Sequence, residues 1–199
     1  MKITHLTSAH PRVDTRIFFK MCSSLANKGF DVSLVVADGK GDETKSGVKI
    51  VDVGPSKNRF FRILSAPKRV YSKAVLIDAD IYHLHDPELL PIGLKLKKCG
   101  KIVIFDSHED IPKQMLTKPY LNKSLLKLLS FSIKKYEAWV CKQLDGVITA
   151  TPFIREKFLK INPNSIDINN FPILVELSTD VKWKDKKKEV CYVGGIDKI

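Results

Sequence analysis

The sequence contains no apolar run that approaches the roughly 18–20 residues of a membrane-spanning helix. It also shows no secretory signal, because Met1 and Lys2 lead at once into a short strand-like segment. These two absences predict a cytoplasmic protein, either free or bound peripherally to the inner face of the plasma membrane.

Paired cysteines are also missing. Cys22, Cys99, Cys141 and Cys191 are far apart and form no C-x-x-C motif. This spacing disfavours a disulfide framework and a structural zinc site. We therefore expect reduced, buried thiols, as in most cytosolic proteins.

The chain has a strong excess of positive charge, with a formal net charge of +12 over 199 residues. A basic surface favours anionic partners, namely phosphorylated ligands, nucleic acid or anionic membrane. No helix-turn-helix, zinc-finger or RNA-recognition signature accompanies the charge. We therefore expect no nucleic-acid partner.

Short apolar runs alternate with helical patterns along most of the chain. This alternation predicts βαβ units, and hence an α/β fold with a Rossmann-like parallel sheet flanked by helices. The expected strands are 2–6, 31–37, 48–53, 81–85, 101–105, 146–151 and 165–170, and the expected helices are 15–27, 58–77, 87–98, 121–143 and 152–160.

The composition changes near residue 170. Residues 171–189 contain a proline, scattered polar residues and a lysine run, which is typical of a linker. Residues 190–199 then form a strand-like run that reaches two glycines, the usual opening of another βα unit. We therefore expect a Rossmann-like domain over 1–170, a linker over 171–189 and the first strand of a second domain over 190–199.

Ligands of open parallel sheets bind at the carboxyl ends of the strands. The loop after the first expected strand carries His10, Arg12 and Arg16 around a helix start, which favours an anion site. The alternative is that Asp14 or Thr15 simply caps the helix.

The loop after the fourth expected strand carries a second polar group. His83 and His85 are two residues apart on a strand, so they face the same side. Asp86 followed by Pro87 is a strong helix start, which makes capping the leading role of Asp86. Histidines at a strand end can also simply pack and form hydrogen bonds.

The third polar group follows the apolar run 102–105, where residues 106–110 read Asp-Ser-His-Glu-Asp. Histidine suits proton handling near neutral pH, so His108 is a candidate catalytic residue. A solvated loop is the alternative.

A metal site is a weaker interpretation of these groups. His83, His85, His108, Glu109 and Asp110 offer suitable ligand atoms. No further H-x-x-D/H string supplies the remaining ligands, so we expect no metal. The Asp-Ala-Asp at 78–80 precedes its strand, at the edge opposite the ligand loops, and we interpret it as a helix end.

Two segments concentrate the basic residues. In the helix 121–143 an apolar stripe is expected to face the core, and lysines gather on another face. The second segment, residues 57–73, contains basic residues and no acidic one. A solvated face is the default interpretation, and contact with an anionic membrane is the alternative. The stripe is Leu125, Leu129, Ile133, Tyr136 and Val140, and the basic residues are Lys123, Lys127 and Lys134, then Lys57, Arg59, Arg62, Lys68, Arg69 and Lys73.

Together these motifs resemble a known family. The chain is similar to the N-terminal domain of GT-B glycosyltransferases, in particular the family-4-like group that builds bacterial surface polysaccharides. The motifs that carry the resemblance are HPRVDTRIFFKMCSSLANKGFDVSLV, DADIYHLHDPELLPIGLKLKKCGKIVIFDSHEDIPKQM, DGVITATPFIREKF and VCYVGGI.

The resemblance implies one lobe of a two-lobed, retaining glycosyltransferase. The N-terminal lobe would hold a glycan or lipid-linked acceptor, and the second lobe most of the nucleotide-sugar donor. The family's paired donor-binding glutamates would lie beyond residue 199, so this chain alone should be inactive. No cofactor is expected, and no divalent metal, because helix dipoles and basic side chains neutralise the diphosphate in this family.

The resemblance also implies roles for individual residues. His108 matches the family's histidine after the fifth strand, and it would position the sugar and stabilise developing charge. His10, Arg12, Arg16, His85, Asp86 and Glu109 are the expected substrate-binding residues, although many relatives have glycines in the first loop where this sequence has HPRVD.

Two other functions remain open. The chain could be a non-catalytic module that binds phosphorylated glycan or anionic lipid, or part of a sugar-nucleotide epimerase, which shares the GT-B fold.

Overall fold

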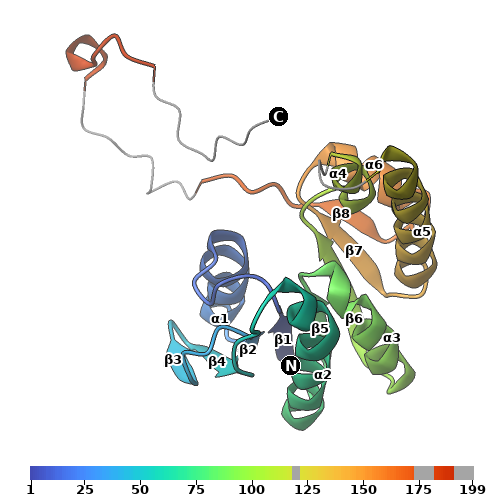
Figure 1. The fold of residues 1–199 in the computed structure, drawn as a ribbon. Helices are drawn as coiled ribbons and strands as arrows, with labels where there is room; N and C mark the ends of the chain where they lie inside the picture. Colours follow the sequence, from blue (N-terminus) through green and yellow to red (C-terminus); the bar gives the residue numbers. More distant parts are fainter. Residues whose placement is uncertain (118–121, 173–181, 191–199) are drawn as a thin grey trace.

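The computed structural model describes residues 1–117, 122–172 and 182–190. They form an eight-stranded sheet in the order β3-β4-β2-β1-β5-β6-β7-β8 (Figure 1). All neighbouring strands are parallel except β3 and β4. The expected α/β fold with a Rossmann-like parallel sheet is therefore confirmed.

The strands are short and their connections are mostly helical. The strands are β1 (Lys2–Leu6), β2 (Asp31–Val36), β3 (Glu43–Lys45), β4 (Val48–Asp52), β5 (Ile81–Leu84), β6 (Ile102–Ser107), β7 (Gly146–Thr149) and β8 (Ser165–Asp167). The helices are the π-helix η1 (Thr15–Cys22), α1 (Ser23–Asn27), α2 (Arg59–Ile77), η2 (Pro87–Leu89), α3 (Leu90–Lys98), α4 (Ile111–Leu116), α5 (Lys123–Cys141), α6 (Pro152–Leu159) and η4 (Trp183–Asp185).

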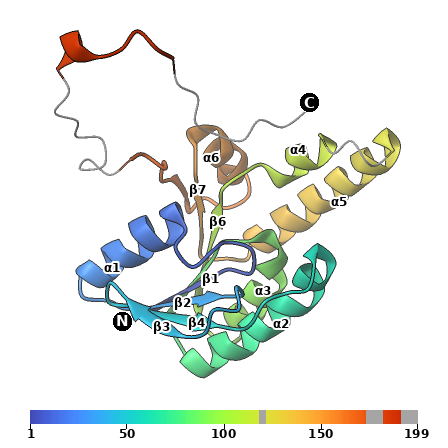
Figure 2. The ribbon, with the colours of Figure 1, turned by 60° about the vertical axis from the view of Figure 1, so that its left-hand side comes forward.

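The sheet has a hydrophobic core on each face. On one face, α2, α3, α5 and α6 pack over a core that includes Tyr82, Phe105 and Phe158. On the other face, η1 contributes Ile17 and Phe18 to a smaller core over β2 and β4. Figure 2 shows α1 on one side of the sheet and α2 and α3 on the other. Alternate residues of each strand therefore face different helices.

The order of the strands places a ligand-binding crevice. From β1 the chain moves to β2 and β4 on one side, and it then returns to β5, β6, β7 and β8 on the other. The loops that follow β1 and β5 consequently diverge, which is where open α/β sheets bind ligands.

Several expected elements differ from the structure. The segment between the expected strands 31–37 and 48–53 contains a further strand, β3, because Ser46 and Gly47 both adopt positive φ and turn the chain back along β4. The strand expected to end at Phe105 continues through Ser107. The helix expected over 58–77 is the single helix α2, and it contains Pro67.

The expected core stripe of α5 is partly wrong. Leu125 and Tyr136 are exposed, whereas Leu126, Ser130 and Val140 are buried. The buried face is therefore offset from the expected one, and it lies against α4, where Ser130 Oγ donates to the Pro112 carbonyl at 2.6 Å.

Other expectations concern the thiols and the acidic pair at 78–80. Cys22 and Cys141 are buried and burial raises the pKa of both thiols, but Cys99 is exposed. Cys191 lies outside the described residues. Asp78 is the left-handed C-cap of α2, which confirms the helix-end interpretation.

The linker expected at 171–189 is described only in part, and the expected strand 190–199 lies outside the described residues except for Val190. The domain boundaries therefore stay predictions. Among the helices that the structure describes, none has both the length and the apolar character needed to cross a membrane.

The contact between α3 and β5 yields a test of the fold. A Cβ added at Gly93 would lie 2.6 Å from Leu84 Cδ1, in a buried contact. We expect Gly93→Ala to lower the free energy of unfolding by about 1–2 kcal/mol, because overpacking outweighs the better helix propensity of alanine. Urea unfolding would measure the change, with exposed Lys98→Ala on the same helix as control. A Gly93→Ala variant as stable as the parent would contradict the close packing.

Candidate functional site

A cavity of about 520 Å³ opens at the carboxyl ends of β5 and β6. The loop after β1 forms one wall, and residues of α2, α4 and α5 form others. Its volume is within the range of small-ligand sites. The cavity contains five of the seven expected site residues, namely His10, His85, Asp86, His108 and Glu109.

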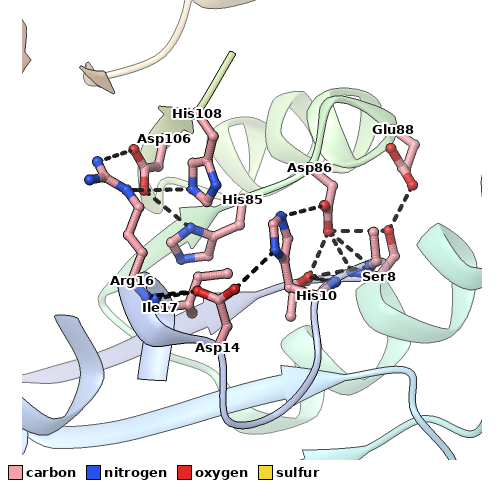
Figure 3. Close-up of polar contacts among 12 residues, drawn as sticks. Ser8, His10, Asp14, Arg16, Ile17, His85, Asp86, Glu88, Asp106 and His108 are labelled. Carbon is pink, nitrogen blue, oxygen red and sulfur yellow. Dashed lines mark hydrogen bonds and ion pairs between the residues drawn. The ribbon is translucent and has the colours of Figure 1, made fainter. Parts of the chain in front are cut away.

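Asp106, the penultimate residue of β6, is the centre of the first polar group (Figure 3). Its Oδ1 accepts from Arg16 Nη2 at 2.8 Å, and its Oδ2 accepts from Arg16 Nε at 2.9 Å. His108 Nε2 lies 2.9 Å from the same Oδ2, and His85 Nδ1 lies 3.4 Å from it. Burial alone would raise the pKa of Asp106, but these hydrogen bonds hold the pKa well below its usual value. Asp106 is therefore an ionised carboxylate inside the protein.

The first turn of η1 positions Arg16. The Asp14 side chain caps this helix by accepting from the backbone N–H groups of Arg16 and Ile17, both at 2.9 Å. Arg16 Nη1 also donates to the Ile168 carbonyl at 2.6 Å. Arg16 thus joins η1 to β6 and to the chain after β8. It does not line the cavity, so its expected contact with a substrate stays a prediction.

Asp86 is the centre of the second polar group. Its Oδ2 accepts from Thr7 Oγ1 at 2.8 Å and from the backbone N–H groups of Ser8 and Ala9 at 2.6 and 3.2 Å. Asp86 is the N-cap residue of η2 and Pro87 begins that helix, as expected, but the Asp86 side chain makes no capping hydrogen bond with η2. The donors of the loop after β1 take the carboxylate instead, and this fixes that loop against β5.

His10 connects the two groups at the cavity wall. Its Nδ1 and Nε2 lie 3.4 Å from carboxylate oxygens of Asp14 and Asp86, respectively. The Asp14 contact raises the pKa of His10, with a further contribution from Asp86. Its ring centroid is 5.0 Å from that of His108. The two imidazoles therefore share one side of the cavity.

Arg12 lies elsewhere. Its guanidinium donates to Asp38 at 2.7 and 2.8 Å, to Glu43 at 2.9 Å and to the Gly41 carbonyl at 2.9 Å. These contacts tie the loop after β1 to the β2–β3 connection. Arg12 does not line the cavity, so a substrate contact by Arg12 also stays a prediction.

Two further carboxylates of the cavity lining, those of Glu109 and Glu137, have different surroundings. Glu109 is exposed and accepts from Gln114 Nε2. Glu137 of α5 is buried and pairs with Lys157 of α6 at 2.5 Å, and burial raises the pKa of Glu137. Sequence analysis missed Glu137, because an acid on the buried face of a helix gives no local signal.

All five histidines of the chain form one contiguous cluster. Sequence analysis did not include His5, which pairs in register with His83 of the neighbouring strand. Nitrogens of His5, His83 and His85 lie within 4.8 Å of one another, as do ligand atoms of His85, Asp106 and His108. The first set offers three neutral imidazoles, whereas the second already pairs with the Arg16 cation. The expectation of no metal stays a prediction.

A family model decides the family of the chain. Residues 15–168 match the model of Glycosyltransferase Family 4. The chain belongs to this family. No curated protein sequence matches the chain significantly.

Solved structures are similar to this family 4 chain in fold. Sucrose-phosphate synthase from Thermosynechococcus elongatus has a TM-score of 0.60 at 13% identity, over 84% of this chain and 47% of that one. LpCGTa in complex with UDP has a TM-score of 0.54 at 12% identity, over 87% and 53%. An E. coli structure described as trehalose-6-phosphate bound with UDP-2-fluoro glucose has a TM-score of 0.53 at 13% identity, over 81% and 42%. The fold is that of a GT-B lobe, and the chain spans about half of each of these structures.

The buried histidines of this family 4 chain predict acid sensitivity. Burial, reinforced by the neighbouring histidines and opposed by Asp106, lowers the pKa of His83 to about 3 and of His85 to about 4, and it lowers that of His5 well below 6.5. Below about pH 6.5 the unfolded chain binds protons that the folded chain does not, so stability is lost as pH falls toward 4. Each histidine contributes up to about 1.4 kcal/mol per pH unit.

Two other groups adjust this pH dependence. The raised pKa of His10 offsets part of the loss, and ionised Asp106 adds to it at lower pH. Urea titrations between about pH 7.5 and pH 4.5 would measure the dependence. His83→Leu should reduce its slope by one histidine's share. A free energy of unfolding that stays constant across this range would contradict neutral burial.

Proposed function

We propose that this chain is the acceptor-side lobe of a retaining glycosyltransferase. It would act with a nucleotide-sugar donor and a glycan or lipid-linked acceptor, in surface polysaccharide synthesis on the cytoplasmic side of the membrane. The observation that carries the proposal is the wall of the cavity, where His108, supported by Asp106 and Arg16, lies beside His10 of the loop after β1 and Asp86 of the loop after β5.

The geometry of His108 determines what it can do. Because ionised Asp106 can only accept, His108 Nε2 carries a hydrogen, and Nδ1 is left for a ligand. The His108 side chain is only 20% exposed, so a sugar hydroxyl could replace water there. A neutral His108 would accept from such a hydroxyl, and a protonated one would stabilise negative charge near a leaving phosphate.

The charges of the cavity favour a hydroxyl-rich acceptor. Its lining includes one arginine, Arg62, which pairs with Glu88 at 3.0 Å, and five carboxylates, from Asp86, Glu88, Asp106, Glu109 and Glu137, although the whole chain has a net charge of +12. Carboxylates accept hydrogen bonds from sugar hydroxyls, and they repel phosphate groups. This lining supports an acceptor sugar in the cavity, and it disfavours the alternative of a module built to bind phosphorylated glycan.

The donor would bind mainly outside this lobe. One structural neighbour is described with UDP and another with UDP-2-fluoro glucose, which supports a nucleotide-sugar as donor. Because this chain spans about half of those structures, we propose that the donor site needs a second lobe. This chain alone would then be inactive.

The role of His108 can be tested in the complete gene product. We expect His108→Ala to lower kcat by about 10²–10³-fold, because an aligned polar group at the reacting centre is lost. The midpoint of urea unfolding should stay close to that of the parent, since His108 is partly exposed. Near-normal turnover in His108→Ala would refute the assigned role.

Product analysis separates the alternatives. A glycosyltransferase forms a glycosylated product only when acceptor is present. Free or epimerised sugar without acceptor would support the epimerase, and binding without turnover by the complete gene product would support the non-catalytic module.

We further infer that an anionic membrane surface lies beside the cavity. Phe60, Phe61 and Leu64 are exposed at the start of α2, and Leu128 and Phe131 are exposed on α5. Both helices also line the cavity, through Arg62 and Ile63 of α2 and Ile133 and Tyr136 of α5. The exposed lysines of these two segments are Lys57 and Lys68, then Lys123, Lys127, Lys134 and Lys135.

Apolar side chains among lysines suit a bilayer of anionic lipid. The only acid of α5 is the buried Glu137, so no exposed acidic side chain of that helix opposes the contact. A lipid-linked acceptor could then reach the cavity from the membrane.

A charge-reversal pair tests the membrane contact. We expect the chain to sediment with vesicles that contain anionic lipid at low salt, and to be released at high salt by screening. Lys127→Glu with Lys134→Glu should abolish most of the binding. Lys40→Glu with Lys188→Glu, an equal charge change at exposed sites elsewhere, should abolish much less. Equal losses for both pairs would mean that net charge alone drives binding.

A further inference from the structure

A line of polar contacts runs inward from the cavity. His108 Nε2 contacts Asp106 Oδ2 at 2.9 Å, and His85 Nδ1 lies 3.4 Å from the same oxygen. His85 Nε2 is in turn 2.9 Å from His5 Nδ1. His85 and Asp106 line the cavity, whereas His5 is fully buried and lies behind them (His85 and Asp106 are seen in Figure 3).

Strand register produces this line. His5 of β1 pairs with His83 of β5, and Leu84 of β5 pairs with Phe105 of β6. One step further along the strands, His85 consequently lies beside Asp106. Since successive side chains alternate between faces, His5, His85 and Asp106 all lie on the face that carries η1 and Arg16.

The geometry between His5 and His85 is that of an N–H···N hydrogen bond. The two ring planes differ by 12°, and their centroids are 5.2 Å apart. The two nitrogens are 2.9 Å apart. The rings therefore meet edge to edge, and both nitrogens lie near the line that joins the two ring centroids. Two imidazoles that bound one ion at about 2.1 Å while their nitrogens stayed 2.9 Å apart would be angled, with centroids roughly 4.5 Å apart.

The charge on Asp106 determines which ring nitrogens carry a hydrogen in this line of contacts. An ionised carboxylate only accepts, so His108 Nε2, at 2.9 Å, carries a hydrogen, and a hydrogen on His85 Nδ1 would point toward the same oxygen across the longer 3.4 Å contact. His85 Nε2 must then be the acceptor of its bond with His5, and His5 Nδ1 the donor. The lowered pKa of His5 and of His85 agrees with neutral rings.

We propose that His85, oriented by His5, is a positioning residue that holds the Asp106 carboxylate and thereby fixes the hydrogen of His108 on Nε2. A packing role alone explains these imidazoles poorly, because His5 Nε2 and His83 Nε2 are buried without a hydrogen-bond partner, and His85 Nδ1 has only the 3.4 Å contact with Asp106 Oδ2, which is longer than a hydrogen bond of good geometry. Apolar side chains would fill the same space without that penalty. The catalytic importance of the arrangement rests on the proposed role of His108, but the position of the hydrogen does not.

The chain is well suited to a direct test, since only five histidines contribute imidazole signals. Two-bond ¹H–¹⁵N correlation spectra of the 199-residue chain report which ring nitrogen carries the hydrogen. We expect His108 and His85 to be single tautomers, protonated on Nε2 and Nδ1, respectively. Single substitutions assign each ring.

Two substitutions of His85 separate its two contacts. His85→Asn keeps an N–H near the position of Nδ1, and it loses the contact with His5. His85→Gln keeps a polar group near Nε2, and it loses the donor to Asp106. We expect His108 to stay a single Nε2–H tautomer in His85→Asn, and to become a mixture of tautomers in His85→Gln.

Turnover of the complete gene product gives a second measurement. His85→Gln should lower kcat about tenfold with little change in KM, because only the alignment of His108 is lost, and His85→Asn should restore most of it. If His85 variants fail to fold, His5→Leu should shift the His108 tautomer in the same direction by a smaller amount.

Three outcomes would overturn the proposal. One is a single His108 tautomer in His85→Gln with unchanged kcat. Another is protonation of His108 on Nδ1 in the parent chain. The third is stoichiometric binding of Zn²⁺ that shifts the signals of His5, His83 and His85, which would make them metal ligands instead. A failure of the proposed function would give a different result from these three. Turnover would be normal in His108→Ala, and the tautomer assignments would still hold.

Discussion

The buried ion pair between Arg16 and Asp106 is the contact on which the candidate site depends. Its two hydrogen bonds of 2.8 and 2.9 Å lie where almost no solvent reaches either side chain. A buried charge is stable only when it is paired and hydrogen-bonded. The ion pair therefore depends on the start of η1 at Thr15, which positions Arg16. It also allows β6 to continue through the charged residue Asp106 at the edge of the sheet.

The same pair organises the histidines. Because Arg16 neutralises Asp106, the carboxylate can stay ionised beside two imidazoles, and it can orient both of them. The π-helical turns of η1 begin one residue before Arg16, and such turns are frequent at functional sites. A π-helix and a strand end thus become a preorganised site through one salt bridge.

Much of the fold could be predicted from local patterns. The strands around β1, β2, β5 and β6 are short apolar runs, and η1 and α2 follow polar caps, Asp14 and Asn58. Local signals of this kind need only the spacing of apolar residues and the chemistry of a helix start. The hairpin turn at Ser46 and Gly47 was also a local signal, but the three-residue strand before it was too short and polar to show a strand pattern.

The polar contacts of the site could not be predicted in the same way. Asp86 has the sequence context of a helix cap, but the backbone donors of a loop 77 and 78 residues away take its carboxylate. His5 joins the cluster only because β1 and β5 are neighbours in the sheet, which no spacing in the sequence reveals. Asp106 and Arg16 are 90 residues apart. Helix caps are decided by neighbours in the sequence, whereas these partners are decided by strand order.

The distribution of charge completes the argument about substrate. Lysines are exposed on α2 and α5 beside apolar side chains, whereas carboxylates line the cavity between those helices. A uniformly basic site would attract phosphate into the cavity, but Arg62 is the one lysine or arginine among the described lining residues, and it pairs with Glu88 at 3.0 Å. Anionic headgroups would therefore meet the rim, and a neutral, hydroxyl-rich group would meet the interior. Such a separation suits an acceptor that is held at a membrane surface and presents a sugar to His108.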